Sequence, residues 1–238
     1  MRSNTTARVV GSLFLTATGA GMLSAVLLGP LDTLHTPQSI AEGAQKTSAG
    51  AIVVLVMIGA IALIPPTLYP VLKEYGEGPA LGYVAARILE AVLLTPAAIG
   101  PLIVVAIGTN QSDAAHLDTV RVVSRTYDTW GNPASSIFFC LGAALLNYLL
   151  YRSRLVPRWI AGWALVAVVP YLAGACLVMF GVLTVSSAIY PLLLAPLALN
   201  EIVLAVWLLT KGFRAPSSAL ISHVADADTN SRAVGISA

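Results

Sequence analysis

Long uninterrupted apolar runs constrain this chain more than any other feature. Several of them exceed 18 residues, and a helix of about 20 apolar residues spans the ~30 Å hydrocarbon core of a bilayer. A soluble domain of this length would instead alternate apolar and polar faces. Mean hydropathy is +0.83 and only 10% of the residues are charged, far outside the usual range of soluble domains. We therefore predict an all-α integral membrane bundle.

The apolar runs predict six membrane-spanning helices, at residues 9–29, 49–69, 81–108, 133–150, 157–182 and 187–209. The first run is longer than the apolar core of a cleaved signal peptide, so we expect it to be retained as a helix. Pro65 and Pro66 predict that the second helix breaks there, and Pro96 with Pro101 predicts a tilted or kinked third helix. Residues 1–215 then form one transmembrane domain, and the polar segment 216–238 is predicted to be a disordered tail.

The distribution of Lys and Arg predicts the orientation of the bundle in the membrane. One set of alternate connections carries Arg2, Arg8, Lys73, Arg152, Arg154, Arg158, Lys211 and Arg214. The opposite connections carry Lys46, Arg121 and Arg125. Because cytoplasmic loops are enriched in these cations, both termini and the tail are predicted to be cytoplasmic. An aromatic belt near the same interface would consist of Trp159, Trp163 and Trp207.

The connection at residues 109–132 is the longest between predicted helices, and two interpretations of it remain open. Apolar and charged residues recur there at near-helical spacing, which is typical of a helix lying on the outer membrane surface. A polar loop with scattered apolar residues explains the same pattern. The residues concerned are Leu117, Asp118, Val120, Arg121, Arg125 and Tyr127.

Four stretches resemble a known family. They are ARVVGSLFLTATGAGMLSAVLLGP (7–30), LYPVLKEYGEGPALGYVAARILEAVLL (68–94), LGAALLNYLLYRSRLVPRWIAGWALV (141–166) and LAPLALNEIVLAVWLLTKGF (194–213). They are similar to domain-of-unknown-function family 4386, and YRSRLVPRW and ILE are the most specific parts. The resemblance implies a six-helix bacterial inner-membrane protein and no particular activity. The family pattern has an acidic residue followed by Leu in the second span, whereas Val54 stands at the aligned position here.

Three ionisable residues lie inside the predicted spans. Arg87 and Glu90 share one face of the third span, and Glu201 lies in the sixth. At 1.5 Å per residue from Pro79 and Lys211, both carboxylates come to roughly 15 Å from the inner boundary. Charges at that depth cost several kcal/mol unless they are paired or hydrated, so they indicate a functional or structural requirement. Asn200 and Asn147 lie in the same half of their spans and complete a predicted intramembrane polar cluster.

The polar cluster has three possible interpretations. An Arg–Glu clip could hold helices in register through polar contacts of about 0.6–2 kcal/mol. Alternatively, one Arg and two Glu sum to −1, so that charge balance requires a proton, a cation or a ligand. In a third arrangement Arg87 extends to the inner interface and never meets Glu201. A closed core would favour the clip, whereas a cavity lined by the cluster would favour binding or transport.

Several functional classes are not supported by the sequence. His35, His116 and His223 all lie outside the predicted spans, which excludes intramembrane Ser–His catalysis and a histidine metal or haem site in the membrane. There is no HExxH, phosphate-binding Gly–Lys loop or dinucleotide fingerprint. A net charge of +2 gives no nucleic-acid footprint. We predict no catalytic residue, cofactor or metal, and the oligomeric state stays open.

The sequence thus favours a non-enzymatic membrane module with a structural or accessory role in the bacterial cytoplasmic membrane. The alternative is a small proton-coupled transporter or ligand-binding membrane protein that uses Arg87, Glu90 and Glu201. In both cases the lipid bilayer is the main partner, and the second adds a small molecule or a proton.

Overall fold

A computed structural model describes residues 2–28, 37–110, 122, 126 and 131–214. The three histidines, the tail at 216–238 and the residues proposed for a surface helix (117, 118, 120, 121, 125 and 127) lie outside the described residues. The predictions made for those residues therefore stay predictions. Within the described ranges the chain is helical, with short connections and no strand.

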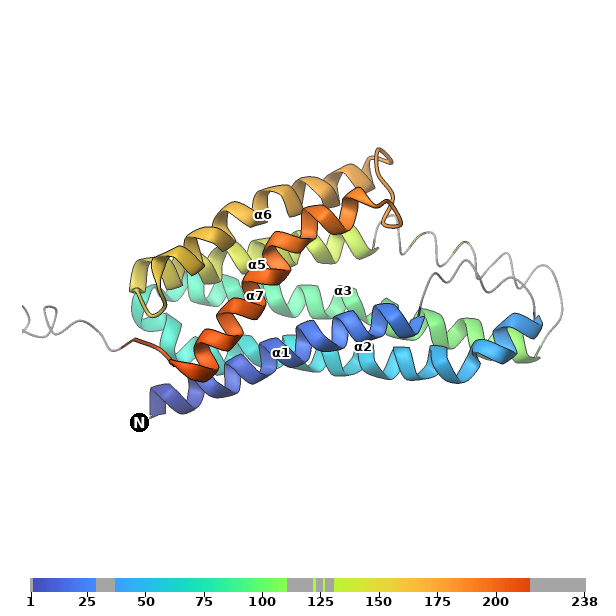
Figure 1. Cartoon of the computed structure of the whole chain (residues 1–238), viewed down its shortest axis with the longest axis horizontal. Coiled ribbons are helices and arrows are strands. Elements are labelled where there is room, and N and C mark those ends of the chain that lie inside the picture. The colour runs from blue at the N-terminus through green and yellow to red at the C-terminus, as the bar shows by residue number, and fades with distance from the viewer. Residues whose placement is uncertain (1, 29–36, 111–121, 123–125, 127–130, 215–238) are drawn as a thin grey trace, which may run out of the picture.

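Six long helices make up the described chain (Figure 1). Each is long and apolar enough to cross a membrane, which confirms the prediction of an all-helical, multi-pass membrane protein. A single turn of 3-10 helix, η2 (Lys73–Tyr75), separates the second helix from the third. The six helices are α1 (Arg2–Leu28), α2 (Pro37–Leu72), α3 (Glu77–Asn110), α5 (Asn132–Ser153), α6 (Arg158–Met179) and α7 (Ile189–Thr210).

The predicted break at the end of the second span is wrong, because α2 continues through Pro65, Pro66 and Pro70 to Leu72. Proline removes one backbone donor, and membrane helices tolerate that loss when neighbouring groups use the freed carbonyls. Close to these prolines the Thr67 hydroxyl adds a hydrogen bond within the helix, to the Leu63 carbonyl at 2.7 Å. The third span is one continuous helix that contains Pro96 and Pro101, and its tilt or kink stays a prediction.

The helices form a closed ring. Each packs against its neighbours in the chain, in the order α1–α2–α3–α5–α6–α7, and α7 packs against α1 to complete the circle. Successive helices run in opposite directions (Figure 1). We call the end that contains Asn4, η2 and Gly212 the near end, and the end that contains Leu28, Asn132 and Met179 the far end. Both ends of the described chain therefore lie at the near end.

The near half of the ring is filled by the largest apolar core. All six helices contribute fully or almost fully buried side chains to it, among them Val10, Leu68, Tyr83, Leu149, Ile160 and Leu204. The chain after α7 also turns back onto this end, where the Arg214 amide donates to the Leu155 carbonyl at 2.9 Å. Gly212 makes that turn at φ +68, in the left-handed region that favours glycine. Packing of this kind closes the near end.

Most basic residues with a described position gather around the near end. The opposite end retains Lys46, which lies early in α2. Trp207 is also at the near end, where the Arg214 guanidinium lies 5.5 Å from the centre of its ring. The near-end cations are Arg8, Lys73, Arg152, Arg154, Arg158, Lys211 and Arg214.

Candidate functional site

A cavity of about 970 Å³ occupies the far half of the ring. Its volume is near the upper end of the roughly 300–1,000 Å³ of pockets that hold small molecules. All six helices line it, and the lining reaches Leu28, Asn132 and Ser186 at the far end. Its inner limit is formed by Arg87, Glu90 and Glu201. The cavity thus extends from the far end of the bundle to the three charged residues within it.

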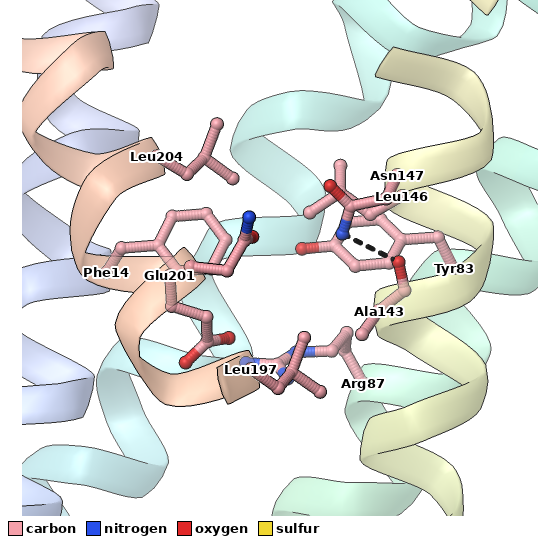
Figure 2. A pocket seen from close by; sticks show the side chains of 10 residues that line it. Phe14, Tyr83, Arg87, Ala143, Leu146, Asn147, Leu197, Glu201 and Leu204 are labelled. Atoms are coloured by element: carbon pink, nitrogen blue, oxygen red, sulfur yellow. Dashed lines mark hydrogen bonds between the residues drawn. The ribbon is translucent and has the colours of Figure 1, made fainter. Parts of the chain in front are cut away.

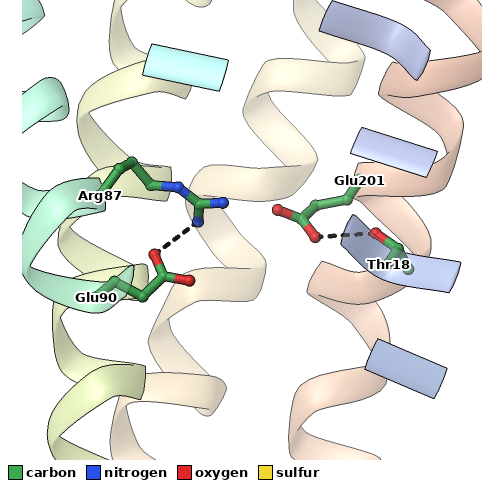
Figure 3. Close-up of polar contacts among 4 residues, drawn as sticks. All are labelled: Thr18, Arg87, Glu90 and Glu201. Carbon is green, nitrogen blue, oxygen red and sulfur yellow. Dashed lines mark hydrogen bonds and ion pairs between the residues drawn. The ribbon is translucent and has the colours of Figure 1, made fainter. Parts of the chain in front are cut away.

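Arg87 and Glu90 form an ion pair within α3. Arg87 Nη1 lies 2.8 Å from Glu90 Oε2 (Figure 3), and the two residues are only 3% and 4% exposed. The guanidinium also lies 5.3 Å from the centre of the Phe139 ring on α5, within range of a cation–π contact. A Cβ at Gly142 would come 2.9 Å from Arg87 Cδ, so the missing side chain on α5 provides the space that Arg87 occupies.

The hydrogen bonding of this pair is incomplete. Among the described residues, Arg87 Nε and Glu90 Oε2 have no hydrogen-bond partner. The 2.8 Å contact between the two side chains is therefore an attraction of charges without the alignment of a hydrogen bond. Buried polar atoms are satisfied in the great majority of cases. The cluster consequently has donor and acceptor capacity that the protein does not use.

Glu201 approaches the cluster from the opposite wall, on α7. Its carboxylate accepts a long hydrogen bond of 3.5 Å from the Thr18 hydroxyl of α1. Figure 3 shows the Arg87 guanidinium pointing across the gap towards Glu201, but these two described residues form no ion pair. Glu201 is less deeply buried than Arg87 and Glu90, and it lines the cavity together with them. Of the three charged residues that line the cavity, Glu201 is therefore the least buried.

Of the two asparagines of the predicted cluster, Asn200 joins two helices and Asn147 forms a hydrogen bond within its own helix. The Asn200 amide donates to the Ile160 carbonyl of α6 at 2.8 Å, and the Asn147 amide donates to the Ala143 carbonyl at 2.9 Å. Both line a second, much smaller cavity of about 10 Å³ on the near side of Arg87 (Figure 2). That volume is close to the minimum for one water molecule.

Two residues of the site were not predicted from the sequence. Tyr83 lies one turn before Arg87 and borders the small cavity. Its hydroxyl and Asn147 Oδ1 have no hydrogen-bond partner within the described chain. The i, i+4 spacing from Tyr83 to Arg87 was the available signal. Thr18 carries no charge in an apolar helix, and nothing in the sequence distinguishes it from the other hydroxyl residues there.

Apolar and aromatic side chains form most of the cavity wall. Phe139 and Tyr171 pack with ring centres 5.3 Å apart, and Tyr190 follows on α7. Val54, where the resembled pattern has an acidic residue, also lines this cavity. The apolar part of the wall includes Met22, Met57, Ile61, Leu94 and Leu194.

The arrangement can bind a small molecule by its apolar surface and one charged group. With Arg87, Glu90 and Glu201 ionised, the inner limit of the cavity carries a charge of −1.

Cys140 and Cys176 are both free thiols. The described residues contain no group of three or more His, Cys, Asp and Glu side chains that could hold a metal ion.

Comparison with known proteins identifies the family of the chain. Neither a curated protein nor a solved structure is significantly similar to it. A family model described as "Domain of unknown function (DUF4386)" matches residues 9–212, which include nearly all of the six-helix bundle and the whole charged cluster. The four stretches that resemble this family all lie within or overlap the matched region. The chain therefore belongs to the DUF4386 family of proteins of unknown function.

Proposed function

We propose that this protein is a non-enzymatic membrane protein that binds a small molecule in the cavity of its far half. The observation that carries the proposal is the ~970 Å³ cavity that ends on Arg87, Glu90 and Glu201. Binding pockets combine a largely apolar wall with a few convergent polar groups. This cavity has that composition, and its polar groups lie together at its inner limit.

The arrangement of the charges argues against a purely structural role for the cluster. Arg87 and Glu90 belong to the same helix, so their ion pair does not join two helices. The six helices are already held together by the near-end core. Burying three charges costs free energy, and here that cost is not offset by an ion pair between helices. A ligand that uses the charges would explain why they are present.

Transport is the form of binding that the one-sided cavity favours. The near end is closed by packing, while the cavity lining reaches the far end. A carrier shows such one-sided access in one of the states through which it exposes a central site alternately. We propose further that the near end faces the cytoplasm of a bacterial cell, because Lys and Arg residues concentrate there. The cavity would then admit its ligand from outside.

A cavity-filling substitution tests the binding proposal. Ala198 lines the cavity one turn before Glu201, so Ala198→Phe would fill part of it with a benzyl group. The full-length protein in lipid nanodiscs is titrated with three probes of similar bulk, the tetraphenylphosphonium cation, the tetraphenylborate anion and neutral triphenylphosphine oxide. We expect saturable binding of at least one probe, weakened about tenfold or more by Ala198→Phe, which corresponds to at least about 1.4 kcal/mol.

Leu199→Phe is the matched control for this substitution. Leu199 is the next residue in α7, is 54% exposed and does not line the cavity. We expect its dissociation constants to stay within about twofold of those of the parent protein, and empty nanodiscs correct for partition into lipid. Absence of saturable binding for all three probes, or equal weakening by the two substitutions, would rule out the cavity as a binding site.

A further inference from the structure

We infer that the ligand of the cavity is an amphipathic organic cation, whose charged group lies beside Glu201 and whose apolar body fills the space between α1, α3 and α7. This inference rests on the proposed binding function and adds the chemical class of the ligand. It follows from the charge of the cluster, the accessibility of each charged group and the character of the wall.

The charge of the cluster favours a cation. Arg87 is compensated by Glu90 at 2.8 Å, whereas the partner of Glu201 is an uncharged hydroxyl at 3.5 Å. One negative charge thus remains without an ion pair in an apolar environment, where the interaction of charges is much stronger than in water. A monovalent cation would bring the site to neutrality. An anion would raise the excess negative charge to −2.

Accessibility assigns the binding role to Glu201 rather than to Glu90. Glu90 is 4% exposed and lies against the guanidinium of Arg87. Glu201 is less buried than Glu90, lines the cavity and belongs to the opposite wall. The weak hydrogen bond from Thr18 orients one oxygen of the carboxylate and leaves the other available. A cationic group entering from the far end would therefore contact Glu201.

The side chains of the cavity wall indicate what kind of molecule carries the positive charge. Tyr171 and Tyr190 present aromatic rings to the cavity, and such rings attract organic cations by their negative faces. Methionine side chains at positions 22 and 57 adapt to ligands of varied shape. A cavity of about 970 Å³ is much larger than an ammonium group alone requires. The cation is therefore expected to carry a substantial apolar body.

An inorganic cation fits the cavity less well than an organic one. Mg²⁺ and Ca²⁺ require about six or more oxygen ligands at short distance. The described residues offer no cluster of three acidic, cysteine or histidine side chains that could hold such an ion. Protonation of Glu201 would also restore neutrality without any ligand, and the experiment below distinguishes that case.

The experiment compares two ions of almost identical shape and opposite charge. Tetraphenylphosphonium and tetraphenylborate are titrated into the full-length protein in nanodiscs, together with the Glu201→Gln, Glu201→Asp and Glu74→Gln variants. We expect saturable binding of the cation at one site per chain, at least about tenfold tighter than binding of the anion. Glu201→Gln should weaken cation binding about tenfold, whereas Glu201→Asp, which keeps the charge, should retain it within a few-fold.

The controls separate the possible outcomes. Glu74 is an exposed carboxylate at the near end, and Glu74→Gln changes the net charge equally without reaching the cavity, so its binding should match the parent. Equal affinity for the two ions, or cation binding that is unaffected in both Glu201 variants, would overturn the cationic class. If either result were found while Ala198→Phe still weakened binding, the cavity would remain a binding site. A Glu201 side chain that is always protonated would give this outcome. Loss of all saturable binding would overturn both proposals.

Discussion

Individual charged residues in this bundle differ sharply in how well they are compensated. Arg87 and Glu90 lie one turn apart on α3 and neutralise one another at 2.8 Å. Removing one partner of a buried pair leaves a charge without compensation and costs about 3–5 kcal/mol. Replacing both partners by uncharged side chains of similar size is often nearly neutral. This asymmetry provides a test of the pair by itself.

At the residue scale, Arg87→Met should destabilise the protein by about 3–5 kcal/mol, because it leaves Glu90 buried without its cation. The double variant Arg87→Met/Glu90→Gln should recover most of that loss. Unfolding by SDS in mixed micelles, followed by circular dichroism, measures both variants. If Arg87→Met alone were as stable as the parent protein, Glu90 would have to be neutral or solvated in the folded protein.

Among the helices, the contact between α1 and α7 decides whether the bundle is a ring or an open row. Gly11 allows the close approach, since a Cβ there would lie 2.8 Å from the Ala205 carbonyl oxygen and 2.9 Å from Leu209 Cγ. The carbonyl belongs to the backbone of α7 and cannot move by a side-chain rotation. The close packing of α1 against α7 at this point, which helps to complete the ring, therefore requires a residue without a side chain.

At the element scale, Gly11→Ala should destabilise the bundle by about 1–3 kcal/mol, the usual cost of overpacking a tight contact. Gly19 lies in the same helix with nothing within 4 Å of an added Cβ. Gly19→Ala should therefore be neutral or stabilising, because alanine favours a helix by up to about 1 kcal/mol over glycine. Thermal unfolding of the two variants in one detergent compares them directly, and equal midpoints would contradict a close α1–α7 contact.

At the scale of the molecule, the described Lys and Arg residues are distributed unevenly between the two ends of the bundle. The near end carries most of the described Lys and Arg residues, and the lining of the cavity reaches the far end. From the positive-inside tendency we propose that the near end faces the cytoplasm. The cavity and the charge asymmetry then determine together the side from which a ligand would enter.

At the scale of the molecule, reporter fusions in a bacterial host test this orientation. Green fluorescent protein fused after Arg214, at the near end, should be fluorescent because it folds in the cytoplasm. Alkaline phosphatase fused after Val182, in the far-end connection that follows α6, should be active because it requires export. The reverse pair of signals would place the far end inside and invert the proposed direction of access.

The helices were largely predictable from the sequence, and their limits were not. Apolar length alone indicates a membrane helix, because backbone groups in lipid must be satisfied within the segment. Hydropathy, however, detects only the part of a helix that lies within the hydrocarbon core. For this reason α1 and α2 begin several residues before the predicted spans. In a soluble protein a proline inside a helix usually ends or kinks it. Beyond their first turns, α2 and α3 nevertheless continue through five prolines, Pro65, Pro66, Pro70, Pro96 and Pro101.

The sequence by itself determined the class of protein and its six apolar helices, because these follow from local composition and from the length that a membrane helix needs. Tertiary structure decided which carboxylate pairs with Arg87, since spacing allows both and only the positions of α3 and α7 distinguish them. It also decided that the helices enclose a cavity instead of a filled core. A cavity depends on side chains from all six helices at once, and no local pattern encodes it.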